Sequence, residues 1–308
     1  MSLTHFPYGI SSMGIPIIPG NVNPFAKAYF VDANVGVDGD DGTDSAKPLK
    51  TMQRAFNKLV GGETIFFTGK IREQLVTPVQ VFDVSVIGVG NRPRHADPTP
   101  AGGQKFANTW SPPASGAVSG QATVRVLQQG WKFNNILFTM ESATAAGVEI
   151  VRNAGAGDAE RDGSHASILG CRFAGAGIGV RFNNTNFSEN PYNVEIADSK
   201  FNDNTTAIQG TQCNSAQIHH NIFQGCTSVI TLAAQNTFIY ENILGAFTAA
   251  GSSGGIDLNG GGGKCFVTKN YLSGTYSIAG GYRVSNANDE WAGNFNTLTG
   301  GITVADPA

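Results

Sequence analysis

The sequence predicts an all-β protein, a right-handed parallel β-helix in which short strands stack as the coils of a solenoid. Forty glycines and thirteen prolines in 308 residues make the chain rich in turns. Only 14% of the residues are charged, and charged amphipathic stretches are nearly absent, so helix should be scarce. A short pattern also recurs along the second half of the chain at the spacing of one coil.

The repeat carries most of this prediction. Each unit has an apolar residue, two variable residues, Asn or a small residue, one variable residue and usually an apolar one. The six units are 168–173, 196–201, 218–223, 239–244, 267–272 and 291–296. Their fourth positions are 28, 22, 21, 28 and 24 residues apart. A leucine-rich repeat is excluded because its leucine framework is missing.

The fourth position of the repeat is predicted to form a corner of the coil. Asparagine tolerates the left-handed backbone conformation that a corner needs. Its side-chain amide can also bond to the asparagine one coil above, which would give an internal ladder. The ladder residues are Asn221, Asn242, Asn270 and Asn294.

Residues 1–27 are predicted to form an extended arm for assembly. Four prolines there block a helix or a central strand. The segment is too apolar to remain solvated and cannot form its own core, so we expect it to dock onto another subunit. The alternative is a strap over the first coil of its own chain. The apolar arm residues are Phe6, Tyr8, Ile10, Ile15, Ile17 and Ile18.

Residues 28–308 are predicted to form one β-helix domain. It opens with a strand at Tyr29–Asp32, and a capping helix follows at about residues 51–60. Thr51 suits the N-cap, and apolar residues recur after it with helical spacing. We expect this helix to cover the open end of the stack. The Pro/Gly/Ser-rich stretch at about 92–120 has no period and is predicted to be a long loop.

Charge and cysteine content narrow the partners. A net charge of −3 and a pI near 5.9 provide no basic field for nucleic acid or a membrane surface. The start lacks a secretory signal, so we expect synthesis in a bacterial cytoplasm. The four cysteines have no C-x-x-C spacing and are interpreted as buried thiols; no cofactor is expected.

The opening of the domain resembles that of pectate-lyase-like β-helix proteins. The residues that carry the resemblance are Tyr29–Asp32, Asp38–Thr43, Pro48–Thr51 and Gly62–Ile65. They follow the order strand, Asp/Gly-rich turn, capping helix and first coil strand of that superfamily. This resemblance implies the fold and no activity. The phrase Thr4–Ser12, ahead of such a β-helix, resembles the start of phage virion structural proteins.

Two groups of side chains are candidates for a catalytic or metal site. The third position of the repeat places Asp198, His220 and Glu241 in one column. Asp198 and Glu241 would then lie roughly 9 to 10 Å apart, near the upper limit for an inverting glycosidase pair. We interpret the column as outward-facing charges that stabilise one another.

The second group is the acidic loop that follows the first strand, which could offer oxygen ligands to calcium. Its carboxylates are Asp38, Asp40, Asp41 and Asp44. Their spacing is not that of an EF-hand, so an Asp/Gly turn is the preferred interpretation. The calcium-and-arginine site of pectate lyases and the paired-Asp and Gly-His-Gly signatures of polygalacturonases are not legible in the sequence.

We therefore predict a non-enzymatic structural protein on the exterior of a bacteriophage virion. It would be a capsid-decoration protein or a tail-spike or fibre, attached through its arm. Its partners would be other virion proteins and further copies of itself, with a trimer favoured. The alternatives are a tail-spike lyase or hydrolase acting on bacterial surface glycan, and a β-helix that binds such a glycan without cleaving it.

Overall fold

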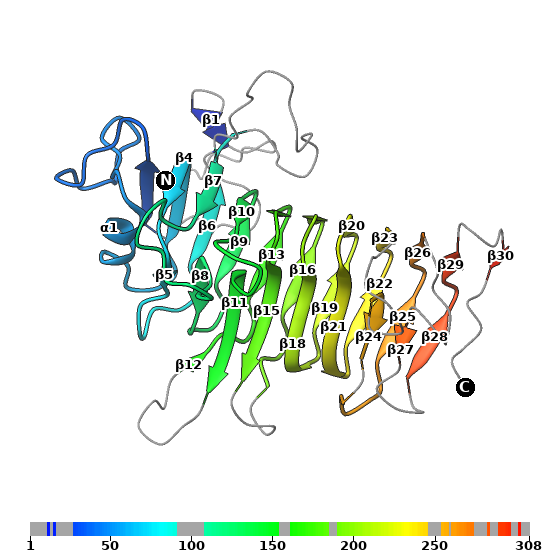
Figure 1. Ribbon diagram of the computed structural model, residues 1–308. Helices are drawn as coiled ribbons and strands as arrows, with labels where there is room; N and C mark the ends of the chain where they lie inside the picture. Colours follow the sequence, from blue (N-terminus) through cyan, green and yellow to red (C-terminus); the bar gives the residue numbers. More distant parts are fainter. Residues whose placement is uncertain are drawn as a thin grey trace.

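A computed structural model shows a right-handed parallel β-helix, as the repeat predicts (Figure 1). It describes residues 11–12, 15–16, 27–90, 108–153, 161–184, 190–245, 254–258, 260–273, 282–283, 289–296 and 301–302. Within these ranges, no helix is long and apolar enough to cross a membrane.

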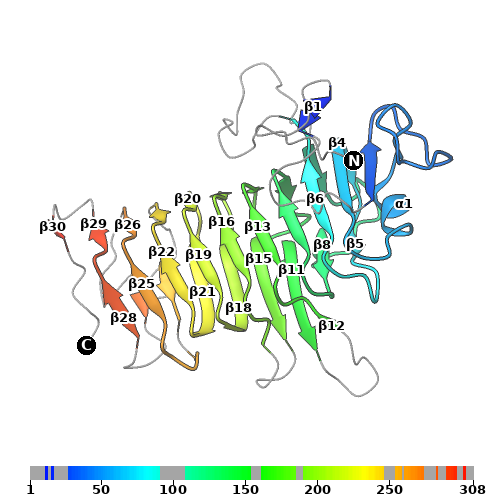
Figure 2. The same ribbon diagram turned by 180° about the vertical axis from the view of Figure 1, so that it is seen from behind.

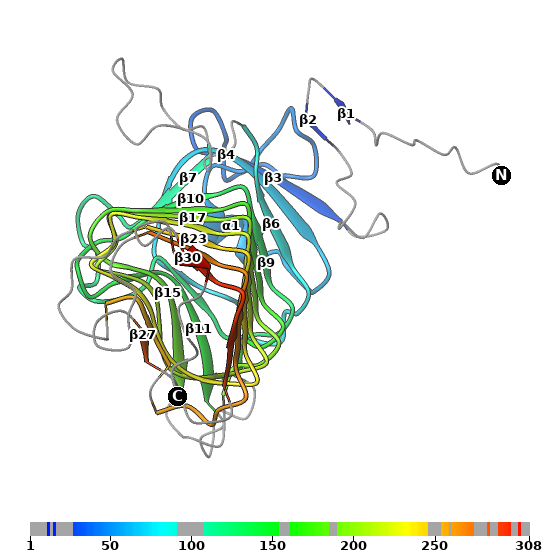
Figure 3. The same cartoon turned by 90° about the vertical axis from the view of Figure 1, so that its right-hand side faces the viewer.

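Each coil contributes strands to three faces, which surround the core when the solenoid is viewed along its axis (Figure 3). Strands on a face pair in parallel with the coils before and after them. The first face is turned toward the viewer in Figure 2. It contains β3 (Ala28–Asp32), β4 (Thr64–Arg72), β6 (Ser85–Gly88), β9 (Lys132–Asn134), β13 (Ser167–Leu169), β16 (Glu195–Ala197), β19 (Gln217–His219), β22 (Phe238–Tyr240), β25 (Phe266–Thr268) and β28 (Glu290–Ala292).

The end of β4 turns onto the second face, and the other strands of that face follow the first-face strands along the chain. They are β7 (Asn108–Ser111), β10 (Leu137–Thr139), β14 (Arg172–Ala174), β17 (Lys200–Asn202), β20 (Ile222–Gln224), β23 (Ile243–Leu244), β26 (Tyr271–Leu272) and β29 (Phe295–Asn296).

The third face closes the coil. Its strands are β5 (Leu75–Val76), β8 (Val124–Val126), β11 (Ala146–Asn153), β15 (Ile178–Asn184), β18 (Thr206–Asn214), β21 (Ser228–Gln235), β24 (Ile256–Asp257) and β27 (Tyr282–Arg283). Among the described strands, three pairings are antiparallel: β12 (Arg161–Asp162) with β11, β30 (Gly301–Ile302) with β29, and β1 (Ser11–Ser12) with β2 (Ile15–Pro16).

A column of phenylalanines forms the centre of the core behind the second face. Because neighbouring strands pair in register, the inward residue of each coil lies directly over that of the next. Phe138, Phe173, Phe201 and Phe223 stack with ring centroids 5.3, 4.9 and 4.9 Å apart. All four are at most 1% exposed, so the aromatic stack excludes water along four coils.

The capping helix α1 (Met52–Phe56) covers the N-terminal end of the stack (Figure 1). Thr51 is its N-cap as predicted, and the Glu73 carboxylate accepts hydrogen bonds from Met52 N and Gln53 N at 2.9 and 2.8 Å. Burial raises the pKa of Glu73. Phe56 packs between Trp110 and Trp131 at centroid distances of 6.0 and 5.2 Å.

The helix is shorter than the predicted range 51–60. It ends at Phe56 because the next amides bond three residues back, from Lys58 N to Ala55 O and from Leu59 N to Phe56 O. Glu63 then accepts from two amides of the following turn, which fixes the exit of the chain.

The prediction of one loop over 92–120 was wrong in part. Strand β7 lies within this range and pairs with β4 and β10. Its Trp110 is fully buried, and the indole N–H donates to Glu73 O at 3.0 Å. The sequence of this four-residue strand is polar apart from one tryptophan. It therefore lacks the alternation of apolar and polar residues by which a strand is predicted. Residues 112–120 are turns, and residues 91–107 lie outside the described ranges.

The predicted arm lies almost entirely outside the described residues. Within it, the structure describes the backbone pairing of β1 with β2 and Lys27, whose carbonyl oxygen accepts from Thr64 N at 3.1 Å. The assembly role of Phe6, Tyr8, Ile10, Ile15, Ile17 and Ile18 therefore stays a prediction.

Replacing Phe201 with Ala should lower the free energy of unfolding by about 3 to 5 kcal/mol, because it opens a cavity within the aromatic stack. Urea unfolding followed by circular dichroism would measure this loss. Phe266→Ala is the matched control: its ring is 42% exposed, and the loss should be about 1 kcal/mol. Equal losses for the two variants would contradict the assignment of the core.

Candidate functional site

The structure brings the four predicted ladder asparagines together inside one corner. The Oδ1 atoms of Asn242, Asn270 and Asn294 each accept from the backbone N and the Nδ2 of the asparagine one coil earlier. These distances are 3.0 and 3.1 Å from Asn221 to Asn242, 3.1 and 2.9 Å from Asn242 to Asn270, and 3.0 and 2.9 Å from Asn270 to Asn294. All four side chains are at most 1% exposed.

Both side-chain amide hydrogens are bonded in Asn221, Asn242 and Asn270. The second hydrogen of Asn242 Nδ2 goes to Ile218 O at 2.9 Å, and Asn270 Nδ2 bonds in the same way to Ile239 O. Ser199 and Cys171 continue the line in earlier coils, because Ser199 N donates to Asn221 Oδ1 and Cys171 N to Ser199 Oγ. Because these polar groups are hydrogen-bonded, the ladder avoids the free-energy penalty of burying unbonded polar groups at a corner.

The conformational reason given for these asparagines was wrong. The left-handed residue of the corner is the one before the asparagine: φ is 53° at Asp198, 55° at His220, 54° at Glu241 and 57° at Lys269. Its amide bonds to the next coil, as from Glu241 N to Thr268 O at 3.3 Å. A non-glycine residue is tolerated there because hydrogen bonds on both sides fix the turn.

This left-handed position is the predicted charge column, and it lies on an exposed ridge between the first and second faces. His220 Nε2 is 2.8 Å from Glu241 Oε2, and Lys269 Nζ is 3.9 Å from Glu241 Oε1. Glu241 is 41% exposed, and Asp198 is exposed one coil before His220. Such exposed ion pairs contribute little to stability.

Aromatic side chains flank the ridge on both faces. On the first face Phe238 and Phe266 stack at a centroid distance of 5.1 Å with 8° between their planes. On the second face Tyr271 meets Phe295 edge-on at 5.8 Å. Burial raises the pKa of Tyr240, and the nearby carboxylates Glu195 and Glu241 raise it further.

His219 and Tyr240 also lie on this ridge, and the sequence analysis did not predict them as site residues. His219 stacks on Tyr240 at 4.8 Å, and its Nε2 lies 3.3 Å from Glu195 Oε1. The signal was present as two consecutive histidines at the end of a repeat strand. Only the histidine at the third position of the repeat was considered.

Three carboxylates of the acidic loop, those of Asp38, Asp41 and Asp44, accept hydrogen bonds from nearby residues of the chain. Asp38 accepts from Lys50 N, Thr51 N and Thr51 Oγ1 at 2.8 to 2.9 Å. Asp41 accepts from the amide of Thr43, and Asp44 from that of Ala46. In the described ranges no three His, Cys, Asp or Glu side chains converge on a possible metal position. The loop therefore has the hydrogen bonding of the predicted Asp/Gly turn.

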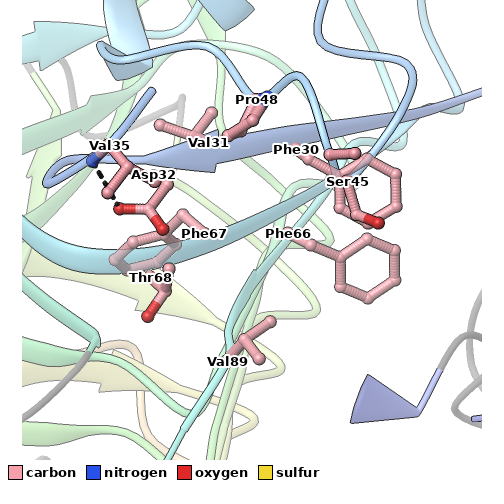
Figure 4. A pocket seen from close by; sticks show the side chains of 11 residues that line it. Phe30, Val31, Asp32, Val35, Ser45, Pro48, Phe66, Phe67, Thr68 and Val89 are labelled. Atoms are coloured by element: carbon pink, nitrogen blue, oxygen red, sulfur yellow. Dashed lines mark hydrogen bonds between the residues drawn. The ribbon is translucent and has the colours of Figure 1, made fainter. Parts of the chain in front are cut away.

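An apolar pocket lies on the outside of the first coils, with a cavity volume of about 170 Å³ (Figure 4). Phe30 and Phe66 stack at a centroid distance of 5.7 Å on one side of it, and Val35 lies on the opposite side beside Asp32. The Asp32 carboxylate at its edge accepts from the amides of Asn34 and Val35, which closes a turn. The pocket offers apolar surface and no pair of groups suited to acid–base chemistry.

The four cysteines are buried and unpaired by disulfides, as predicted. Burial raises the pKa of Cys171 and Cys213 to about 12 and that of Cys226 to about 11. These thiols are protonated at neutral pH and serve as small apolar core residues.

Comparison with known proteins defines the fold alone. No protein-family model matches the chain, and no curated protein matches its sequence. The solved structure of Escherichia coli ybhc superimposes with a TM-score of 0.54 at 13% identity, over 96% of this chain and 90% of that one. The pectate lyase Pel9A gives 0.48 at 14% identity over 87% and 67%. Geobacillus virus E2 ORF18 gives 0.35 at 13% over 87% and 60%.

Replacing Asn242 with Leu should cost about 1 to 3 kcal/mol of stability, because it leaves the buried amide of Asn221 without its acceptor. Thermal and urea unfolding would measure the loss. Asn34→Leu, at an exposed loop position, is the control and should change stability by about 0.5 kcal/mol or less. An Asn242 variant as stable as this control would show that the ladder is dispensable.

Asp38→Asn should remove a pH-dependent part of the stability. Burial alone would raise the pKa of Asp38, but the hydrogen bonds from Thr51 and Lys50 outweigh it and hold the pKa below the usual 3.8. A lowered folded-state pKa stabilises the fold above pH 3.8, and that contribution is lost as the pH falls through the folded value.

The variant should therefore melt at a lower temperature than the wild type at pH 7, and the difference should shrink below pH 3.8. Asp44→Asn keeps an oxygen that can accept from Ala46 N and should show a smaller loss. A difference for Asp38→Asn that is constant with pH would contradict the role of the carboxylate.

Proposed function

We propose that the chain is a non-enzymatic structural protein on the exterior of a bacteriophage virion, attached through its N-terminal arm. The observation that carries the proposal is a set of exposed apolar side chains around one corner of the later coils. Phe238 and Phe266 on the first face and Ile243 and Tyr271 on the second are 42 to 56% exposed. A patch of this kind is typical of a surface that contacts another protein.

The orientation of the rings favours a protein partner. Phe238 and Phe266 stack face to face, so each covers one ring face of the other and mainly edges point outward. Ring edges on the first face and the exposed aliphatic Ile243 on the second suit close packing against side chains of another subunit. A trimer of this chain and contacts with other virion proteins would both use such a surface.

The charge column supports a non-enzymatic role. A catalytic acid or base needs surroundings that tune its proton affinity and a place for the reacting atoms. Glu241 instead lies between His220 and Lys269 on an exposed ridge, where opposite charges offset one another. These groups suit a hydrated surface better than a glycan-cleaving centre.

A tail-spike that binds or cleaves bacterial surface glycan is the second candidate. Tyr271 favours it, because the ring is 56% exposed and Phe295 meets it edge-on. Turnover or binding across a panel of bacterial polysaccharides would separate the two candidates. Loss of a measured cleavage in Glu241→Gln would establish the enzymatic reading.

Deleting residues 2–20 should leave the β-helix folded with an unchanged melting temperature and prevent its incorporation into particles. The reason is that the arm cannot bury its apolar residues within a core of its own. Burying four such side chains on a partner is worth about 6 to 12 kcal/mol before the ordering entropy is subtracted. Mass spectrometry of purified particles would measure incorporation.

A full-length chain with Ser2→Ala is the control and should be incorporated normally. A deletion variant that assembles like the wild type would contradict the role of the arm. One whose solenoid unfolds would show that the arm is a strap on its own first coil. Absence of the full-length chain from particles would contradict the virion assignment itself.

A further inference from the structure

Two consecutive histidines meet on the ridge between the first and second faces. His219 ends β19, and His220 follows it with a φ of 55°. Consecutive side chains of an extended strand point to opposite faces. The left-handed backbone at His220 interrupts that alternation, so the two rings lie side by side. Their Nδ1 atoms are 2.7 Å apart, and their centroids are 5.0 Å apart.

The outer nitrogen of each ring faces a carboxylate from a neighbouring coil. His219 Nε2 lies 3.3 Å from Glu195 Oε1, and His220 Nε2 lies 2.8 Å from Glu241 Oε2. Tyr240 also stacks on His219 with 10° between the planes. Carboxylate oxygens accept hydrogen bonds, so this geometry suits a hydrogen on each Nε2 atom.

The two facing Nδ1 atoms cannot both present lone pairs to each other without repulsion. A neutral imidazole with its hydrogen on Nε2 has a lone pair on Nδ1. Two such lone pairs would face each other across 2.7 Å. If one ring instead carried its hydrogen on Nδ1, the lone pair of its Nε2 would face a carboxylate oxygen. A positive charge between the two Nδ1 atoms, either a proton or a metal ion, resolves the conflict.

We propose that His219 and His220 bind a divalent transition-metal ion through their Nδ1 atoms. Imidazole nitrogen suits zinc, nickel and copper. The two carboxylates occupy the place of the groups that orient metal-binding histidines by accepting from the other ring nitrogen. No third His, Cys, Asp or Glu converges there among the described residues, so water would complete the coordination.

The required adjustment is small. Zinc–nitrogen bonds of about 2.0 to 2.1 Å at a tetrahedral angle place two nitrogens about 3.3 Å apart. The Nδ1 atoms must therefore separate by roughly 0.6 Å from their present 2.7 Å. His220 is 48% exposed, so its ring has room to turn.

Metal binding would replace a proton held between the two Nδ1 atoms. Two nitrogen–metal bonds form as bound waters leave the metal ion, the N–H bond breaks, and the proton passes to water. Protons compete for the same nitrogens, so affinity falls as the pH falls. The titratable and charged groups around the pair are Asp198, Glu195, Glu241, Tyr240 and Lys269, the last 3.9 Å from Glu241.

Isothermal titration of the full chain with zinc chloride at neutral pH tests the proposal. We expect a single zinc site whose binding releases a proton. The zinc affinity should fall about tenfold or more in His219→Asn and in His220→Asn, and about tenfold in Glu241→Gln. His165→Asn is the matched control, because His165 also has a positive φ of 58° and Asn tolerates that backbone. It should bind zinc as the wild type does.

Absence of zinc binding by the wild type would overturn the proposal, as would equal binding by the His219→Asn/His220→Asn double variant. If the variants fail to fold, nitrogen-15 spectra of the wild type decide. Zinc should shift the Nδ1 signals of His219 and His220. Signals that stay in place while zinc binds elsewhere would overturn the assignment.

Discussion

Register between successive coils is the constraint on which the rest of the structure depends. Parallel pairing places Phe173 over Phe201 and Phe201 over Phe223. A slip of one residue would turn these inward side chains toward solvent and bring outward ones into the core. The asparagine ladder reinforces the same register from the corner, since its amides bond only when the coils are aligned. Core packing and polar bonding therefore specify one arrangement.

The repeat was predictable because each coil solves the same physical problem. An apolar residue must face the core at Ile218 and Ile239, and a polar group that can bond along the axis must fill the corner at Asn221 and Asn242. Those requirements leave a short pattern that persists although the intervals between coils vary. Strand β7 could not be predicted in this way, because its burial depends on Trp110 packing beneath the capping helix.

The histidine pair shows a different limit of prediction. A period-two pattern assigns His219 and His220 to opposite sides of a strand. Their contact depends on the left-handed backbone at His220. The sequence does not reveal this conformation, because the same corner position carries different residue types, Asp198, Glu241 and Lys269, in other coils. Hydrogen bonds between coils impose this conformation on whichever residue occupies the position. Side-chain chemistry at the ridge can thus vary while the backbone stays fixed.

The last coil bears on how such a solenoid avoids growing without limit. A stack of parallel strands ends in unpaired backbone groups that could accept another chain. At the N-terminal end α1 packs over the core. At the other end β30 reverses direction and pairs antiparallel with β29, through Phe295 and Ile302. A strand of opposite polarity cannot propagate the parallel stack, so β30 occupies the edge of β29 at which a further parallel strand of the second face would pair.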